Sequence, residues 1–180
     1  MATQKARIVY CVDTSALVTI QRIYRLSKLE GIWEFLDELS RNGRIAAPKQ
    51  VLAELEEGQD DEICQWAKSH ASIFRQLTQE QWQVGKDIVN DPKFRGFIDP
   101  EKEVPDADPL VIALAVEERK QPRLILEKWV VVADESFAKQ GKKPRIPDVC
   151  KDPRYDIECI STKDWFEWEG LRLVRMKPYF

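Results

Sequence analysis

Residues 7–15 read Arg-Ile-Val-Tyr-Cys-Val-Asp-Thr-Ser. Residues 8–12 are apolar or aromatic, which is typical of a strand buried on both faces, and such strands belong to parallel sheets covered by helices on each side. The apolar run ends at a single charged residue, Asp13, which Thr14 and Ser15 follow. Since ligands of open α/β sheets bind just beyond the carboxyl ends of the strands, Asp13 is the first candidate for a functional site.

Strand and helix patterns alternate along the rest of the chain. Short apolar runs predict further strands at residues 45–47, 129–133 and 158–160. Helical spacing predicts helices after Asp13, over Trp33–Ser40, after Pro48 up to Gly58, over Ile63–Phe74 (capped by Asp60 and Asp61), over Glu80–Val89, from an N-cap at Asp108, and after a cap at Thr162. This alternation predicts an α/β sandwich with a mostly parallel central sheet.

Composition is that of a single globular domain. The chain has 180 residues, of which 43% are hydrophobic and 33% charged, and it shows no internal repeat or domain boundary. The net charge of −3 excludes binding to polyanions through bulk charge alone. Basic residues gather locally in Lys139–Arg145 and in Arg172–Lys177, where a solvated surface is the ordinary interpretation.

Cysteine and histidine usage argues against zinc. The four cysteines, Cys11, Cys64, Cys150 and Cys159, form no C-x-x-C pair, and His70 is the single histidine, within a helical pattern. We expect a cytoplasmic protein with reduced thiols, because no signal peptide and no apolar run of membrane-spanning length is visible.

Acidic residues recur at the positions where α/β sheets build sites. Glu54 lies in the helix after the second strand, Asp108 opens the helix after a loop rich in proline, and Asp134-Glu135 ends the strand at 129–133. Carboxylate oxygens are the ligands that Mg²⁺ and Mn²⁺ prefer. Taken singly, each acid also has an ordinary role as a cap, a turn residue or a solvent-facing side chain.

Several classes of protein are disfavoured by what is missing. Haloacid dehalogenase phosphatases use Asp-x-Asp, whereas Asp13 is followed by Thr14 and Ser15. A receiver domain would need an early acidic pair and a late lysine after a strand. No glycine-rich phosphate loop is present, which argues against nucleotide-binding enzymes.

The acidic pattern resembles that of the PIN-domain nucleases. The matching motifs are Val-Asp-Thr-Ser at 12–15, Val-Leu-Ala-Glu-Leu at 51–55, Asp-Pro-Leu-Val-Ile-Ala-Leu-Ala at 108–115 and Val-Val-Ala-Asp-Glu at 131–135. The fourth motif departs from the common Thr-x-Asp, and its alignment makes Glu135 the fourth acid with Asp134 as second choice. The resemblance covers residues 7–137 as a core, and 138–180 then form a C-terminal extension of one PIN-like domain.

The resemblance implies a three-layer α/β/α sandwich and a ribonuclease dependent on Mg²⁺ or Mn²⁺. Its catalytic and metal-binding residues would be Asp13, Glu54, Asp108 and Glu135, supported by Thr14 and Ser15, with Asp106 an extra acid of unassigned role. The segment Arg145-Ile-Pro-Asp-Val-Cys150 is similar to an uncharacterised prokaryotic branch near the VapC-type toxins. That similarity implies an antitoxin protein as partner and a homodimer.

Two further expectations concern binding surfaces. RNA affinity must come from local basic groups, and Lys139, Lys142, Lys143 and Arg145 follow the last acidic strand. The large number of tryptophans allows Trp33 or Trp82 to serve an interface, with core packing as the ordinary interpretation. The alternative function is a non-catalytic PIN-like module that binds RNA or protein.

Overall fold

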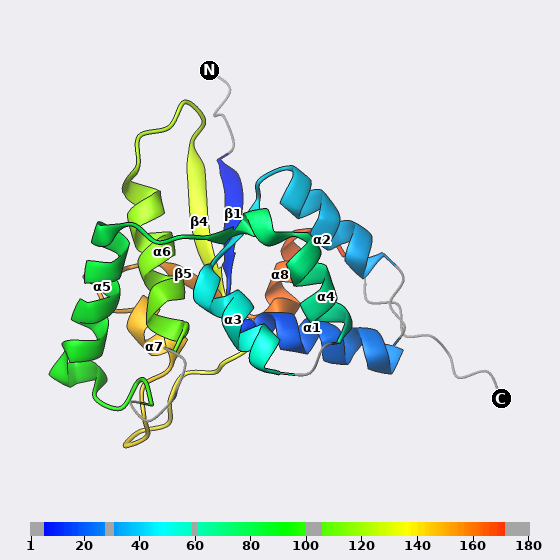
Figure 1. Cartoon of the computed structure of the whole chain (residues 1–180). Helices are drawn as coiled ribbons and strands as arrows, with labels where there is room; N and C mark the ends of the chain where they lie inside the picture. The colour runs from blue at the N-terminus through cyan, green and yellow to red at the C-terminus, as the bar shows by residue number, and fades with distance from the viewer. Residues whose placement is uncertain (1–5, 28–30, 59–60, 100–105, 172–180) are drawn as a thin grey trace.

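A computed structural model shows an α/β fold around a five-stranded, all-parallel sheet (Figure 1). It describes residues 6–27, 31–58, 61–99 and 106–171. The strand order, β3-β2-β1-β4-β5, is PIN-like and places the predicted first strand at the centre. The expected fold class is therefore confirmed, with a sheet that is parallel throughout.

The elements fall close to the predicted ones. The strands are β1 (Arg7–Val12), β2 (Ile45–Pro48), β3 (Phe74–Arg75), β4 (Glu127–Val132) and β5 (Glu158–Ile160). The helices are α1 (Thr14–Ser27), α2 (Ile32–Arg41), α3 (Lys49–Glu57), α4 (Glu62–Ser69), α5 (Gln79–Asn90), α6 (Asp108–Lys120), α7 (Ile146–Cys150) and α8 (Thr162–Trp168), with short 3₁₀ turns at Ala71–Ile73 and Pro92–Phe94. Among the described residues, no helix is long and apolar enough to cross a membrane.

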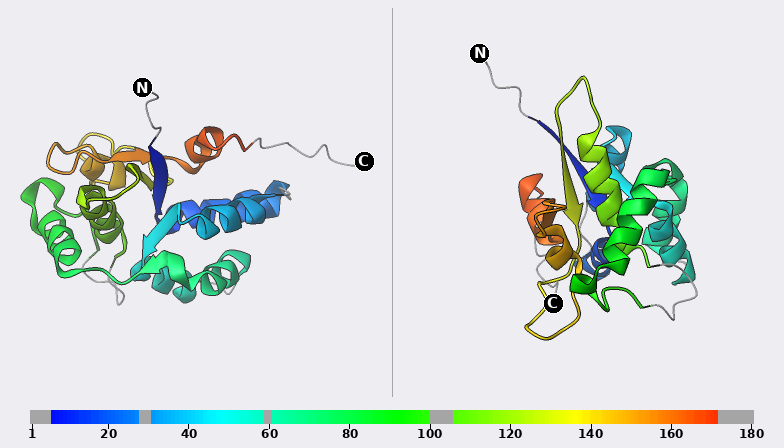
Figure 2. Two further views of the ribbon diagram at one scale, coloured as in Figure 1. Left: turned by 90° about the horizontal axis from the view of Figure 1, so that it is seen from above. Right: turned by 90° about the vertical axis from the view of Figure 1, so that its left-hand side faces the viewer.

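Strand β1 is covered on both faces, as its apolar sequence predicts. The Tyr10 ring lies 5.2 Å from that of Trp165 on α8, whereas the neighbouring Cys11 donates from Sγ to the carbonyl oxygen of Val111 on α6. Because successive side chains of a strand point to opposite faces, α8 and α6 lie on opposite sides of the sheet. The right-hand view of Figure 2 shows the strands between these two layers.

Helix α6 is the most deeply buried helix of the domain. All of Pro109–Val116 is buried, which is typical of a helix enclosed by other elements rather than one with a solvent face. On one side it contacts the sheet, and on another it packs closely against α5. A Cβ at Gly85 of α5 would lie 2.8 Å from Leu110 Cδ2, so any other residue there would displace the Leu110 side chain.

Three local predictions were wrong. The helix expected to reach Phe74 ends at Ser69, and Phe74–Arg75 is instead the edge strand β3, too short to show a period of its own. The N-cap of α6 is Ala107 rather than Asp108, and the N-cap of α8 is Ser161, whose hydroxyl accepts from the Asp164 N–H, rather than Thr162. Asp61 does cap α4, as predicted, whereas Asp60 and the cluster at 172–177 lie outside the described residues.

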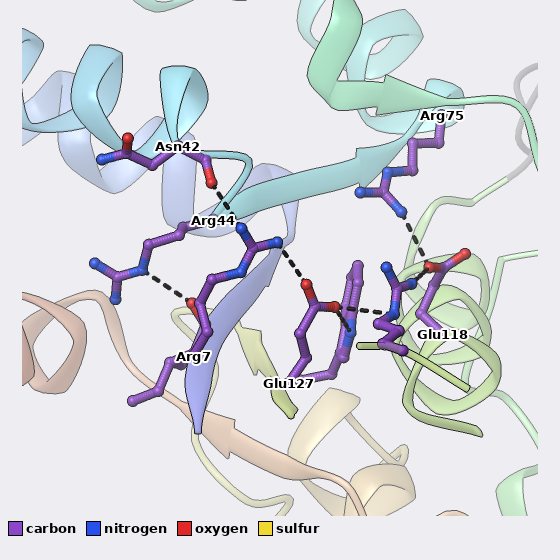
Figure 3. Close-up of polar contacts among 9 residues, drawn as sticks. Arg7, Asn42, Arg44, Arg75, Glu118 and Glu127 are labelled. Carbon is purple, nitrogen blue, oxygen red and sulfur yellow. Dashed lines mark hydrogen bonds and ion pairs between the residues drawn. The ribbon is translucent and has the colours of Figure 1, made fainter. Parts of the chain in front are cut away.

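A charge network joins the amino ends of β1 and β4 to the last turn of α6 and to the side chain of Arg75, the last residue of β3 (Figure 3). We call it the amino-end network, and its members are Arg7, Glu127, Arg123, Glu118 and Arg75. Glu127 pairs with both Arg7 and Arg123, whose Nε lies 3.0 Å from Glu127 Oε2. Glu118 pairs with Arg123 and with Arg75, whose Nη1 lies 3.1 Å away.

Candidate functional site

The carboxyl end of the central strand holds Asp13 in the protein interior. The Asp13 N–H donates to the carbonyl oxygen of Val132 on β4 (2.9 Å), which fixes the residue between the two strands. Asp13 is 3% exposed, and its Oδ2 accepts from the Ser15 N–H at 2.9 Å. Its Oδ1 is buried without a hydrogen-bond partner. A buried carboxylate oxygen without a partner costs free energy, so Asp13 Oδ1 is a candidate atom for binding a ligand.

Glu54 of α3 ties the starts of two other helices together. Its Oε2 accepts from the Thr14 hydroxyl at the start of α1, and its Oε1 accepts from the Ala107 N–H, just before α6, at 2.9 Å. Ser15 has a similar supporting role, because its Oγ accepts from the Asp134 N–H at 3.0 Å. Thr14 and Ser15 therefore position the acidic residues beside them, the role that the PIN resemblance implies for them.

The two acids after β4 turn in different directions. Asp134 Oδ1 accepts from the Thr162 N–H of α8 (2.9 Å), and its Oδ2 is buried without a partner. Glu135 Oε2 accepts from the Ile146 N–H of α7 (3.1 Å), and its charge acts on Asp108. This arrangement favours Glu135 over Asp134 as the fourth acid of the site.

Four neighbouring acids at this edge shift the pKa of Asp108. The pKa of Asp108 is raised to about 9, first by burial and then by the neighbouring charges of Asp13, Asp106, Glu135 and Glu54, in that order of size. We call these five residues the acidic cluster. Asp106, whose role the sequence leaves unassigned, thus belongs to it.

Burial is also the main cause of the raised pKa of Asp13, about 6, and the Glu54 charge adds to it against the opposing hydrogen bonds from Ser15. No Lys, Arg or His of the described chain forms an ion pair with Asp13, Glu54, Asp108 or Glu135. The fold therefore brings like charges together here and leaves them without protein cations.

The donor set suits a hard divalent cation in chemistry but is not a ready-made cage. Within the described ranges, no three His, Cys, Asp or Glu side chains are grouped closely enough to hold a metal ion. Glu54 and Glu135 are hydrogen-bonded to the protein instead. Mg²⁺ keeps several waters and is often held by one or two carboxylates together with substrate phosphate, so the unpartnered oxygen of Asp13 and the carboxylate of Asp108 fit such an ion.

A cavity of about 610 Å³ opens beside the acidic cluster. Its lining includes Asp106 of the cluster and the predicted basic residues Lys139, Lys142, Lys143 and Arg145. The structure thus brings the basic loop next to the acids, as an RNA-binding surface would require. It also adds an exposed aromatic residue, Phe137, which no sequence motif singled out although it stands between the acids at 134–135 and the lysines.

His70 and the two tryptophans considered for an interface have structural surroundings. His70 is half-buried and its ring stacks on Trp66 at 4.5 Å, remote from any second histidine or cysteine ligand, as the sequence predicts. Trp33 and Trp82 are partly buried and pack against the hydrophobic core. They therefore give no support to an interface.

Comparison with known proteins identifies the family. The chain matches the profile described as "Domain of unknown function (DUF4411)" over residues 10–173. The chain belongs to the DUF4411 family. The match runs from β1 to just beyond α8, so the DUF4411 domain includes most of the segment after residue 137 that the PIN resemblance sets apart. Searches of curated proteins and of solved structures each gave no match.

Proposed function

We propose that this DUF4411 protein is a metal-dependent endoribonuclease that hydrolyses phosphodiester bonds of RNA. One observation carries the proposal: Asp13 is 3% exposed at the end of the central strand, and its Oδ1 has no partner. Burying a carboxylate oxygen without a partner costs free energy, which a purely structural role for Asp13 does not explain. The charges of Glu54 and Glu135, which have no ion-pair partner in the described chain, act on Asp108 together with those of Asp13 and Asp106, which supports a site for a positively charged ligand.

The chain's residues divide the work as follows. Asp13 and Asp108 would hold Mg²⁺ or Mn²⁺, and Glu54 and Glu135, which are hydrogen-bonded to the protein, would add negative charge beside it, with Asp106 and Asp134 nearby. Such an ion, when bound, supplies a Lewis acid and a water of lowered pKa. Asp13 and Asp108 give up their protons as positive charge arrives, because their raised pKa values come from burial and mutual repulsion. Thr14 and Ser15 hold Glu54 and the segment after β4 in place.

The finer assignment to VapC-like toxins rests on the PIN resemblance and on residues 145–150. In that proposal the partner is an antitoxin protein, and the enzyme acts as a homodimer. The residues concerned form α7, whose first N–H is bound by Glu135, so the segment adjoins the proposed site. Light scattering of the purified protein at micromolar concentration tests the dimer, and a monomer there would refute it.

Metal-dependent cleavage by the purified protein tests the proposed activity. We expect an end-labelled RNA to be cut internally with Mn²⁺ or Mg²⁺ and to stay intact with EDTA. Glu54→Gln should lower the cleavage rate by about 100-fold or more. Glu57→Gln is the matched control, because Glu57 is exposed on the same helix α3 and should keep the full rate.

The result also separates the proposal from its alternative. RNA that is bound but never cut, with either metal, would refute the nuclease and favour a non-catalytic RNA-binding module. Cleavage that resists EDTA, or equal cleavage by Glu54→Gln and Glu57→Gln, would refute the site.

A further inference from the structure

The cavity beside the acidic cluster is walled by two loops. Segment 96–99 forms one wall and segment 136–145 the other, and Asp106 lies in the lining between them. The volume of about 610 Å³ is large enough for a ligand of nucleotide size. Because Asp106 lines the cavity and its charge acts on Asp108, a ligand in this cavity lies beside a member of the acidic cluster.

Three lysine ammonium groups in this cavity have no acidic partner. Lys139, Lys142 and Lys143 are exposed, and no ion pair within the described part of the chain engages them. Some lysines elsewhere are paired with acids, as Lys93 is with Asp152 and Lys128 with Glu158. Unpaired cations gathered in one cavity of a protein with net charge −3 favour an anionic ligand.

Phe137 adds a flat apolar surface to the same cavity. Its side chain is 57% exposed, whereas most large apolar residues of the domain are buried. The ring also borders a second cavity, of about 600 Å³, from which the Lys151 ammonium lies over it at 5.6 Å from the centroid. Phe137 thus separates the two cavities. Lys151 contacts its ring from the second cavity, and the ring also borders the cavity beside the acidic cluster.

We propose that this cavity is a subsite for one unpaired nucleotide of the RNA, with its base stacked on Phe137 and its phosphate beside Lys142 and Lys143. An anion combined with an aromatic ring is what a nucleotide presents, and exposed aromatic side chains in basic grooves bind bases by stacking. The inference rests on the proposed function for its substrate. A base held in a duplex cannot offer its face to Phe137, so the subsite selects unpaired RNA.

Binding measured without cleavage tests the subsite. The probe is a fluorescein-labelled oligouridylate of eight nucleotides, titrated in EDTA with proteins that carry Asp13→Asn to prevent cutting. Phe137→Ala should weaken binding about 5- to 100-fold, the range for loss of one stacked base. Phe137→Trp should restore it, because an indole also stacks.

Salt dependence distinguishes stacking from charge. Phe137→Ala should leave the slope of log Kd against log salt unchanged, whereas Lys142→Ala with Lys143→Ala should reduce that slope. Lys163→Ala is the matched control, since Lys163 is 78% exposed on α8, away from the cavity lining. Lys163→Ala should therefore leave the affinity and the slope close to those of the parent, because it removes only one charge distant from the cavity.

Three outcomes would overturn the subsite. The first is an affinity of the Phe137→Ala variant for the oligouridylate within twofold of that of its parent. The second is that Phe137→Ala weakens the binding of an RNA duplex of the same length by the same factor. The third is that the parent protein does not bind the oligouridylate. Failure of the nuclease proposal looks different, because a wild-type protein that binds the probe through Phe137 yet never cuts RNA with Mn²⁺ keeps the subsite and loses only the activity.

Discussion

The amino and carboxyl ends of the strands differ in whether their acidic side chains have cationic partners. In the amino-end network every acid has a cation: Glu127 has Arg7 and Arg123, and Glu118 has Arg123 and Arg75 (Figure 3). At the carboxyl end, Asp13, Glu54, Asp108 and Glu135 have no cation in the described chain. The carboxyl end therefore differs from the amino-end network, because the described chain supplies no cation for these four acids.

The partners of Trp129 extend the contrast. Its Nε1 donates to Glu127 Oε2 (3.2 Å), and the guanidinium groups of Arg75 and Arg123 lie 5.2 and 5.7 Å from its ring centroid. The arginines of the amino-end network therefore also contact an aromatic ring. The following predictions test this contrast by substituting residues at each end.

The largest expected effect is on catalysis. Asp13→Asn or Asp108→Asn should lower RNA cleavage by about 1000-fold or more, because each removes a charge from the proposed metal site. Glu127→Gln should keep the wild-type cleavage rate at a temperature where it is folded, since Glu127 lies at the other end of the sheet. Cleavage assays on proteins checked by circular dichroism measure this, and full activity of both Asn variants would contradict the site.

The next largest effect is on the free energy of unfolding, and it is expected at the amino-end network. Glu127→Gln should lower the free energy of unfolding by about 1–3 kcal/mol, because it removes the largely buried carboxylate that pairs with Arg7 and Arg123. Urea denaturation gives the value. A change within about 0.5 kcal/mol, as for an ordinary surface substitution, would mean that the amino-end network contributes little.

A third prediction concerns pH. In the folded chain the pKa of Asp108 is about 9 and that of Asp13 about 6, against about 4 when unfolded. The folded state therefore binds more protons than the unfolded state between these values, and stability is lost as pH rises. The Tm of metal-free protein should fall from pH 5 to pH 9.

Asp108→Asn should flatten that fall and raise the Tm at pH 8 by about 2–6 °C in EDTA. No cap hydrogen bond is at stake, because Ala107 is the N-cap of α6. Mn²⁺ should raise the Tm of the wild type but not that of the variant. A wild-type Tm indifferent to Mn²⁺, together with a less stable variant, would show that Asp108 is an ordinary residue of the first helical turn.

The smallest effect is on the salt dependence of RNA binding. Replacing Lys139, Lys142 and Lys143 by Gln should reduce the slope of log Kd against log salt by about two to three units, roughly 0.7–0.9 for each RNA phosphate that no longer meets a lysine. The slope is measured between low and moderate salt in EDTA. An unchanged slope would place the RNA on a surface other than the cavity beside the acidic cluster.

Most of the fold was predictable because its signals are local and strong. The apolar runs of β1 and β4 and the glycine after α3 defined their elements within a residue or two. Strand β3 was missed because two residues, Phe74 and Arg75, carry no periodicity, and only pairing with β2 makes them a strand. The cap of α6 was misplaced since Asp108 before proline imitates a cap while its carboxylate points to a charged neighbourhood.

The acidic residues of the candidate site could be selected from the sequence, but their arrangement could not. The motif order brought out Asp13, Glu54, Asp108 and Glu135, and the structure places them within reach of one another's charge. The hydrogen bond from Ala107 to Glu54 joins residues far apart in the sequence, so no local pattern reveals it. The same holds for Phe137, whose exposure depends on loops that only the folded chain brings together.

The position of β4 between β1 and β5 also governs when the site comes into being. Strand β1 is made first, yet its neighbour β4 is completed only at Val132, and Glu135 follows it. A nascent chain that has not reached this point contains Asp13, Glu54 and Asp108 but lacks the Val132 carbonyl oxygen that accepts from the Asp13 N–H. Such long-range pairing is slow to form, so any activity of the acidic cluster begins only after most of the protein has left the ribosome.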